Sequence, residues 1–541
     1  MSLVDTAARQ SADRVERKAA SPVDWRSLVF YVAAAIVGAV HAMLAVLAFT
    51  RSPVDVDEGF NLVVVRNIAD GVGYMSDGVY TADVPTDFEA AITTGPTMLV
   101  PAAALHAMGL DLVVAGRVVG LVFYVLLLVG LGLMGRRIAG RWGALAAVVS
   151  PLLLDLYRND NSPVYGPGDL LGEYATAAFA VFAILAARRR PFWAGMLLGL
   201  ALVTKIVALF LAPAVAVAVW WAWFGAPLRS RAGALARMVV GALVPLTVYE
   251  FSKFVVLGSH DYASLFAGYF AKIEEERLPT QMLDEKLATL LSSWFVPAFL
   301  VLVVSAVLLC ASTAVITVRA AQDRATLLAS LRTWPVGLVV SSVVAAIGTV
   351  AVWGYLTFTD PTWIRHPAPG LIIGAGGVCA ATVALVTRIL AEPSRGVRRA
   401  GVAIAGLCAA TAGAAIVAHE TSASDAQRFM TISHQQEIAD AIVDSGASSV
   451  QGIWGPIEPL SALSGVPASS LWSGVDPRAL MVIDKYERGQ MAATGSVLAD
   501  VLCGERVLVS QVVLCWPAAD AQERLDGVTV ADPVTGDASD G

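Results

Sequence analysis

Long apolar segments recur along this chain, and they limit its fold more than any other feature. A bilayer core of ~30 Å is crossed by about 20 apolar residues in a helix, and runs of this kind recur through the 541 residues. Only 15% of the residues are charged, against ~25% in soluble domains. The sequence therefore predicts an all-α polytopic membrane protein. It excludes an ordinary cytosolic enzyme and, with a net charge of −7, a basic nucleic-acid binder.

The apolar runs predict about eleven membrane helices. The first run, 28–49, is longer than the ~7–15-residue apolar region of a signal peptide and is expected to remain as a helix. The run 192–224 is too long for one span, so we expect Pro213 to divide it. The other spans are predicted at 112–134, 142–157, 171–187, 192–207, 208–224, 238–257, 291–315, 335–357, 367–387 and 400–418.

Basic residues alternate between the loops, as the positive-inside rule requires. The first outer loop, 51–111, is acidic, and the outer loop 258–290 contains the run Glu274-Glu275-Glu276. This pattern predicts a cytoplasmic segment 1–27, a transmembrane domain 28–418 and an extracytoplasmic α/β domain 419–541. Composition rich in Ala, Val and Arg favours a bacterial cell membrane. The predicted cytoplasmic loops carry Arg136, Arg137, Arg141, Arg188 to Arg190, Arg229, Arg231, Arg237, Arg319, Arg324, Arg332, Arg388, Arg395, Arg398 and Arg399.

Two of the five cysteines, Cys503 and Cys515, lie in the predicted outer tail. An oxidising compartment permits a disulfide between them, with two free thiols as the alternative. The other three cysteines lie within predicted spans, where Cys is mostly a small apolar side chain.

Two adjacent carboxylates, Asp57 and Glu58, follow the first helix at the expected membrane boundary. A solvated acidic loop is the simplest interpretation. However, the amphipathic segment 60–69 is expected to lie along the interface as a short helix, and the apolar stretch 95–110 follows it. Together these segments would cover a cavity, and the two carboxylates would lie at its opening.

Several cations are expected near the outer ends of helices. Lys205 lies inside an apolar run, where a charged group is a functional candidate by default, although snorkelling to the interface is the alternative. Arg117 and the pair Arg365-His366 are placed near the same side of the membrane. Because guanidinium groups recognise oxyanions through forked donors, these cations predict a site for a lipid phosphate.

Two further carboxylates, Asp169 and Glu173, flank the start of the helix predicted at 171–187. Capping and dipole compensation explain both in structural terms. The interpretation is weaker for Glu173, which enters the apolar run. We therefore keep the pair as candidates for positioning an acceptor or a divalent cation.

Short motifs occur in a fixed order over residues 28–390. They are Asp57-Glu58-Gly59, the segment from Arg66 to Tyr74, Thr94-Gly95-Pro96-Thr97, Gly116-Arg117, Gly172-Glu173, Gly195, the segment from Gly199 to Lys205, and Ile364-Arg365-His366-Pro367. In this order the chain resembles the GT-C glycosyltransferases that use polyprenyl-phosphate sugars, such as protein O-mannosyltransferases and lipid A aminoarabinose transferases. His366 departs from the family's more usual aromatic residue, and the tail falls outside the resemblance.

The resemblance implies that an acidic residue of the first outer loop is the catalytic base, which is Asp57 here, with Glu58 as the alternative. A polyprenyl phosphate leaves readily, so one carboxylate is enough to take the acceptor's proton, and direct displacement inverts the sugar. We expect Lys205, Arg365 and Arg117 at the donor phosphate. The sequence establishes no cofactor, and a divalent cation is left open. The expected partners are a lipid-linked sugar, membrane lipid and a glycan, lipid or protein acceptor.

Two other functions remain open at this point. A transporter or flippase of a lipid-linked sugar would also need a cavity with cations, but such proteins often carry inverted repeats, and no repeat is evident. A membrane scaffold that displays the tail would explain the tail but not the ordered polar residues.

Overall fold

The computed structural model describes most of the chain, and the structural statements below concern these residues: 25–78, 85, 87–89, 92–154, 167–275, 288, 290–294, 325, 329, 332–356, 365–391, 393–426, 431–452, 457–471, 474–484, 499–510 and 512–526. The chain forms two compact units, Met1–Met43 and Leu44–Gly541. The described part of the first unit is the beginning of helix α2 (Trp25–Thr50). The sites described below lie in the second unit.

Within the described residues, five helical segments are long and apolar enough to cross a membrane. This finding agrees with the predicted membrane class, while the predicted count of about eleven helices is not established. Most of the predicted run 291–315 lies outside the described residues. The five segments are Ser27–Thr50, Leu112–Val148, Leu228–Gly268, Trp334–Val352 and Ala368–Ala391, and shorter apolar segments are Glu173–Ala186, Pro191–Thr204 and Ile206–Ala222.

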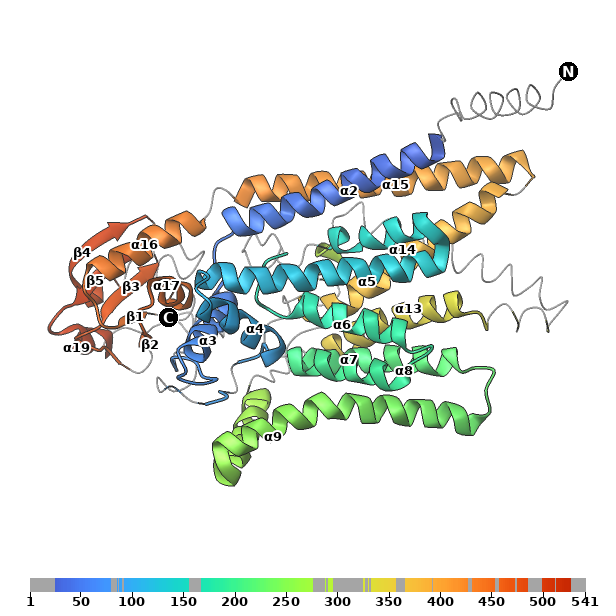
Figure 1. The fold of residues 1–541 in the computed structure, drawn as a ribbon. Helices are drawn as coiled ribbons and strands as arrows, with labels where there is room; N and C mark the ends of the chain where they lie inside the picture. Colours follow the sequence, from blue (N-terminus) through green and yellow to red (C-terminus); the bar gives the residue numbers. More distant parts are fainter. Residues whose placement is uncertain are drawn as a thin grey trace, which may run out of the picture. The chain divides into compact units, whose positions relative to one another are not determined.

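The helices of the second unit pack side by side (Figure 1). Helix α5 (Leu112–Val148) contacts α6 (Glu173–Ala186) and α14 (Ala368–Ala391). Helix α7 (Pro191–Thr204) lies between α6 and α9 (Leu228–Glu275), and α13 (Trp334–Leu356) contacts α14. The bounds of α13 and α14 agree closely with the spans predicted at 335–357 and 367–387.

Helix α5 contains a reversal at Ala139 and Gly140, whose backbone angles are not helical. Gly140 has φ 66° and ψ −153°, a conformation that L side chains rarely adopt. A Cβ on Gly135 would lie 2.2 Å from the carbonyl oxygen of Gly143, so the chain turns back there. The separate runs predicted at 112–134 and 142–157 correspond to the two arms, although the second helical arm ends at Val148.

The long apolar run 192–224 is interrupted at Lys205, close to the boundary between the predicted spans 192–207 and 208–224. The attribution of the break to Pro213 was wrong. Lys205 is extended, with φ −158° and ψ 131°. It separates α7 from the 3₁₀ helix η2 (Ile206–Leu211), which leads into α8 (Ala212–Ala222). Pro213 lies in the first turn of α8, where its missing N–H costs no helical hydrogen bond.

Helix α9 extends well beyond the predicted span 238–257. It continues to Glu275 across a bend at Gly258, which has φ 73°, so the first part of the predicted outer loop 258–290 is helical (Figure 1). On the other side of the bend, α9 packs closely against α7: a Cβ on Gly195 would lie 1.9 Å from the carbonyl oxygen of Met238. Part of the glycine-rich motif thus serves helix packing.

The segment between α2 and α5 forms two helices, α3 (Val56–Ala69) and α4 (Pro96–Ala107). The predicted helix 60–69 therefore begins earlier, and Asp57 and Glu58 belong to its first turn. It packs against α4, α5 and α17 (Ile457–Ser464), while its expected place along the membrane interface stays a prediction. Its apolar side chains, including Leu62 and Val64, are buried in a shared core, as is typical of a helix enclosed by protein.

The chain after α14 contains helix α15 (Arg395–Ala426) and then α16 (Ile432–Asp444), which precedes a five-stranded sheet of order β2-β1-β3-β5-β4 (Figure 1). Strands β2, β1 and β3 are parallel, and β5 pairs antiparallel with β3 and β4. We call α16 and the elements after it the C-terminal α/β region. The mixed sheet fits the predicted α/β class, while the boundaries 419–541 stay a prediction. The remaining bounds are β1 Val450–Gly452, β2 Ala468–Ser470, β3 Leu480–Asp484, β4 Cys503–Val509, β5 Val512–Pro517 and α19 Ala521–Asp526.

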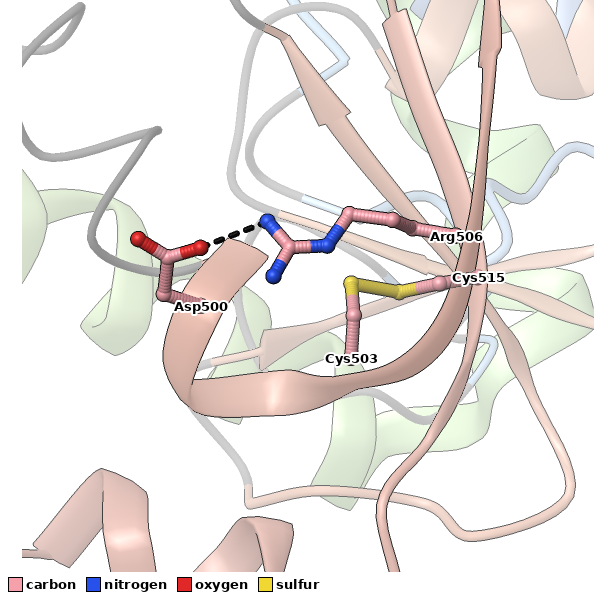
Figure 2. The surroundings of a disulfide bond; sticks show 4 residues. All are labelled: Asp500, Cys503, Arg506 and Cys515. Carbon is pink, nitrogen blue, oxygen red and sulfur yellow. Dashed lines mark hydrogen bonds and ion pairs between the residues drawn. A yellow bond between two sulfur atoms is a disulfide. The ribbon is translucent and has the colours of Figure 1, made fainter.

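A disulfide joins Cys503 and Cys515 across the β4–β5 hairpin, beside the ion pair of Arg506 with Asp500 (Figure 2). The two Cα atoms are 5.5 Å apart, which is an ordinary disulfide separation. The pairing inferred from the sequence is present in the structure.

We expect the double variant Cys503→Ser/Cys515→Ser to lower the unfolding free energy of the C-terminal α/β region by about 2–3 kcal/mol, because the loop closure no longer restricts the unfolded chain. Denaturant titration with and without reductant measures the change. Peptide mapping under non-reducing conditions that finds both thiols free would contradict the assignment.

Candidate functional site

Three consecutive residues at the start of α3 have three different surroundings. Successive side chains on an α-helix are separated by about 100° around the axis. Asp57 is 33% exposed and pairs with Arg365. Glu58 is 1% exposed and pairs with Arg117, and Gly59 packs against α17. Helical phase thus separates two carboxylates that are adjacent in the sequence.

The most accessible carboxylate of this group, Asp57, meets a buried cation. Its Oδ2 lies 2.5 Å from Nη2 of Arg365, and the Arg365 side chain is 6% exposed. Arg365 belongs to the turn directly before α14. Nη1 of the same guanidinium lies 3.9 Å from Oδ2 of Asp55, so one arginine serves two carboxylates.

Asp55 was missed by the sequence analysis. It is the N-cap residue of α3, and Asp is among the residues preferred at that position. Recognising the start of the helix would therefore have singled it out. Burial raises the pKa of Asp55 to about 6, with the charge of Asp57 adding to the increase and Arg365 opposing it. Asp55 is mostly ionised at pH 7 and takes up a proton as the pH falls through about 6.

Lys205 lies in a buried ion pair rather than snorkelling to an interface. The extended backbone between α7 and η2 presents its side chain to Glu173, the first residue of α6. Nζ also donates a hydrogen bond to the carbonyl oxygen of Leu171, at 3.0 Å. The break in the apolar run therefore places one cation against the start of another helix.

Motifs that are distant in the sequence meet at this break. The amide of Gly95 donates to the carbonyl oxygen of Thr204 at 2.8 Å, and the hydroxyls of Thr97 and Thr204 are 2.6 Å apart. Asn61, four residues after Asp57 on α3, donates to Oγ1 of Thr94 at 3.1 Å. These contacts connect the first turns of α3 and the start of α4 to the end of α7.

His366 is influenced by two cationic residues, Lys205 and Arg365. Its pKa is lowered well below the usual histidine value, first by burial and then by the positive charges of Lys205 and Arg365. The imidazole is therefore neutral at pH 7. Because both charges act on this imidazole, we group the ion pairs Arg365–Asp57 and Lys205–Glu173 with it as one cluster.

Arg117 does not join this cluster through its hydrogen bonds, in contrast to the expectation that it would bind phosphate with the other cations. Its Nε and Nη2 donate to Glu58, both at 3.3 Å. Its other donors reach backbone carbonyls of Ala48 at 2.5 Å and of Ser52 and Pro53 at 3.0 Å. The pair is almost fully buried and ties α3 and α5 to the end of α2.

The two carboxylates near α6 differ in position. The N-cap of α6 is Gly172, so Asp169 does not cap the helix, although its side chain is buried. Glu173 lies in the first turn, where the helix dipole favours a negative charge. Among the residues that the structure describes, no group of three or more His, Cys, Asp or Glu side chains is arranged to hold a metal ion. The divalent cation therefore stays an expectation.

Comparison with known proteins identifies the fold. No protein-family model and no curated protein matches the chain. ArnT from Cupriavidus metallidurans, bound to undecaprenyl phosphate, is similar with a TM-score of 0.51 and 14% identity, covering 92% of this chain and 99% of that one. An oligosaccharyltransferase from Archaeoglobus fulgidus is similar with a TM-score of 0.51 and 10% identity, covering 92% of this chain and 76% of that one. The chain therefore shares the fold of these two proteins, which agrees with the fold expected from its sequence motifs.

Proposed function

We propose that this chain is an inverting glycosyltransferase that moves a sugar from a polyprenyl-phosphate donor to an extracytoplasmic glycan, lipid or protein. The observation that carries the proposal is the partly exposed Asp57 in contact with the buried Arg365, in one cluster with Lys205. Such a cluster offers a base and an anion site side by side. The similar ArnT structure holds undecaprenyl phosphate, which supports a lipid-linked donor.

The donor phosphate would be bound by Arg365 and Lys205. A guanidinium has five N–H donors in a fork that matches the oxygens of a phosphate, and Arg365 presents this group beside Asp57. Glu173 and the Leu171 carbonyl fix the Lys205 ammonium from one side. The two cations would stabilise the charge that grows on the phosphate as the bond to the sugar breaks.

Asp57 would act as the base. It takes the proton of the acceptor hydroxyl while that oxygen bonds to the anomeric carbon, and the bond from this carbon to the phosphate oxygen breaks. Attack from the opposite face inverts the anomeric centre. We assign this role to Asp57 rather than Glu58, because the Glu58 carboxylate is buried against Arg117.

Glu173 would act through Lys205 by orienting its ammonium, and a direct role toward an acceptor or cation remains the alternative for Glu173 and Asp169. For the placement in a bacterial cell membrane we propose a cytoplasmic N-terminus and an outer site, supported by the alternating basic loops. The C-terminal α/β region contacts α3, so it would lie on the same outer side.

A direct test reconstitutes the purified chain in proteoliposomes with a panel of labelled polyprenyl-phosphate sugars and an envelope lipid and glycan extract. Transfer of label to an acceptor, with release of polyprenyl phosphate, is the expected result. Movement of intact labelled lipid between leaflets without any transfer would instead indicate a flippase.

We expect Arg365→Ala and Lys205→Ala each to weaken binding of undecaprenyl phosphate by roughly 10–100-fold, since hydrogen bonds to charged groups are worth about 1.5–3 kcal/mol. Arg365→Lys should retain part of the affinity because it keeps the charge. Binding to the detergent-solubilised protein can be measured by native mass spectrometry.

The control for this experiment is Arg524→Ala, which removes an exposed arginine of α19 that pairs with Asp520. Its affinity for undecaprenyl phosphate should equal that of the unmodified chain. Unchanged affinity in both Arg365→Ala and Lys205→Ala would contradict the phosphate site.

A further inference from the structure

The connection between α2 and α3 ends at the proposed catalytic carboxylate, and it is held from two sides. On one side, Arg117 binds the carbonyl groups of Ala48, Ser52 and Pro53. The next residue, Val54, is bound by a side chain from a distant part of the chain, Gln435 of α16. Val54 directly precedes the N-cap of α3, so its position decides where that helix begins.

Gln435 satisfies both backbone polar groups of Val54. Its Oε1 accepts a hydrogen bond from the Val54 amide at 2.7 Å, and its Nε2 donates to the Val54 carbonyl oxygen at 2.8 Å. Both residues are buried. The planar amide thus accepts one hydrogen bond and donates the other, which restricts the movement of the two peptide groups that flank Val54, as a neighbouring strand would.

We propose that Gln435 is a positioning residue for Asp57, and that the C-terminal α/β region thereby forms part of the active site. The role of Gln435 in catalysis rests on the proposed function, whereas its hydrogen bonds to Val54 do not. Gln435 reaches Asp57 indirectly, because the hydrogen bonds described for the Gln435 side chain go to the backbone of Val54. It would act through the start of α3, which carries Asp55 and Asp57 toward Arg365.

Other contacts between the same region and α3 agree with this role. Gly59 lies so close to α17 that a Cβ there would be 2.5 Å from the backbone nitrogen of Pro459. About two turns further along α3, Nη1 of Arg66 donates to the carbonyl oxygen of Ser461 at 3.0 Å. Helix α3 is therefore supported by α17 along its length, and α16 holds the chain just before its catalytic end through Gln435 and through the amide of Ile432, which donates to the carbonyl oxygen of Arg51.

Removing the Gln435 amide would leave two buried backbone groups of Val54 to find new partners. The connection would shift, or water would enter, and either change moves Asp57 relative to Arg365. A misplacement of about 1 Å at a reacting group lowers the rate by about 10²-fold. The donor cations Lys205 and Arg365 are held by α7 and by the turn before α14, so donor binding should change little.

The test compares Gln435→Ala with Gln436→Ala in the full-length protein. Gln436 is the neighbouring exposed glutamine, which bonds to Asp440 on its own helix, so it is a matched control. Hydrogen exchange of the segment 51–59 should be faster in Gln435→Ala only. In the transfer assay its kcat should fall by about 10–100-fold, with the donor KM and the affinity for undecaprenyl phosphate within about 2-fold of the unmodified values. Gln435→Glu keeps an acceptor for the Val54 amide, so its exchange rate and its kcat should lie between those of Gln435→Ala and the unmodified chain.

Each outcome decides the proposal. Equal exchange at 51–59 in the two alanine variants would overturn the contact, and faster exchange with an unchanged kcat would overturn the positioning role. Loss of protection throughout α16 and the sheet in both Gln435→Ala and Gln435→Glu would show a general structural role and would also overturn it. If the unmodified chain transfers no sugar, the proposed function fails, while the exchange measurement still judges the contact.

Discussion

Asp57→Asn is expected to lower sugar transfer by about 10²–10⁴-fold, the usual contribution of a positioned proton acceptor. The substitution keeps the shape of the side chain and removes its basic oxygen. Undecaprenyl phosphate binding should not weaken, because Arg365 loses a carboxylate that neutralises it. Initial rates in proteoliposomes, together with donor affinity in detergent, separate the two quantities.

The neighbouring carboxylates provide the comparison. Near-normal turnover by Asp57→Asn alongside an inactive, folded Glu58→Gln would transfer the base role to Glu58. Near-normal turnover by Asp57→Asn alongside an inactive Asp55→Asn would transfer it to Asp55, whose Oδ2 lies 3.9 Å from the same guanidinium. Near-normal turnover by all three variants would leave this part of α3 with a structural role only.

Arg117→Ala is expected to reduce the unfolding free energy by about 3–5 kcal/mol, which is typical when one partner of a buried ion pair is removed. The Glu58 carboxylate would remain buried without its cation, and the carbonyl groups of Ala48, Ser52 and Pro53 would lose a shared donor. Thermal and denaturant unfolding in detergent measure the loss.

A double variant separates the effect of charge from that of packing. Glu58→Leu/Arg117→Met replaces both charges with apolar side chains, so it should recover a large part of the stability lost in Arg117→Ala. Arg524→Ala, which breaks an exposed pair, should cost only ~0–1 kcal/mol. Equal small losses in Arg117→Ala and Arg524→Ala would show that the buried pair contributes little.

The sequence by itself indicated the membrane class, the fold shared with the two similar structures and several helix positions. Spans such as α13 and α14 follow from local composition, because every backbone polar group of an apolar run in a bilayer must be satisfied within the helix. The disulfide also followed from the sequence, since its cysteines are close along the chain and lie in the tail expected outside the cytoplasm. The order of short motifs was enough to indicate the fold, although no single motif was specific.

Tertiary structure alone decided which polar groups face one another. Pro213 predicted the wrong break because a proline is tolerated in a first helical turn, whereas Lys205 leaves the helix to reach Glu173. Asp57 and Glu58 are adjacent carboxylates, and their local sequence does not show which cation each one meets. The phase of α3 turns Asp57 toward Arg365 and Glu58 toward Arg117. The partner of Val54 lies 381 residues away, and a contact at such a separation has no local signal because it depends on how two separately folded segments pack.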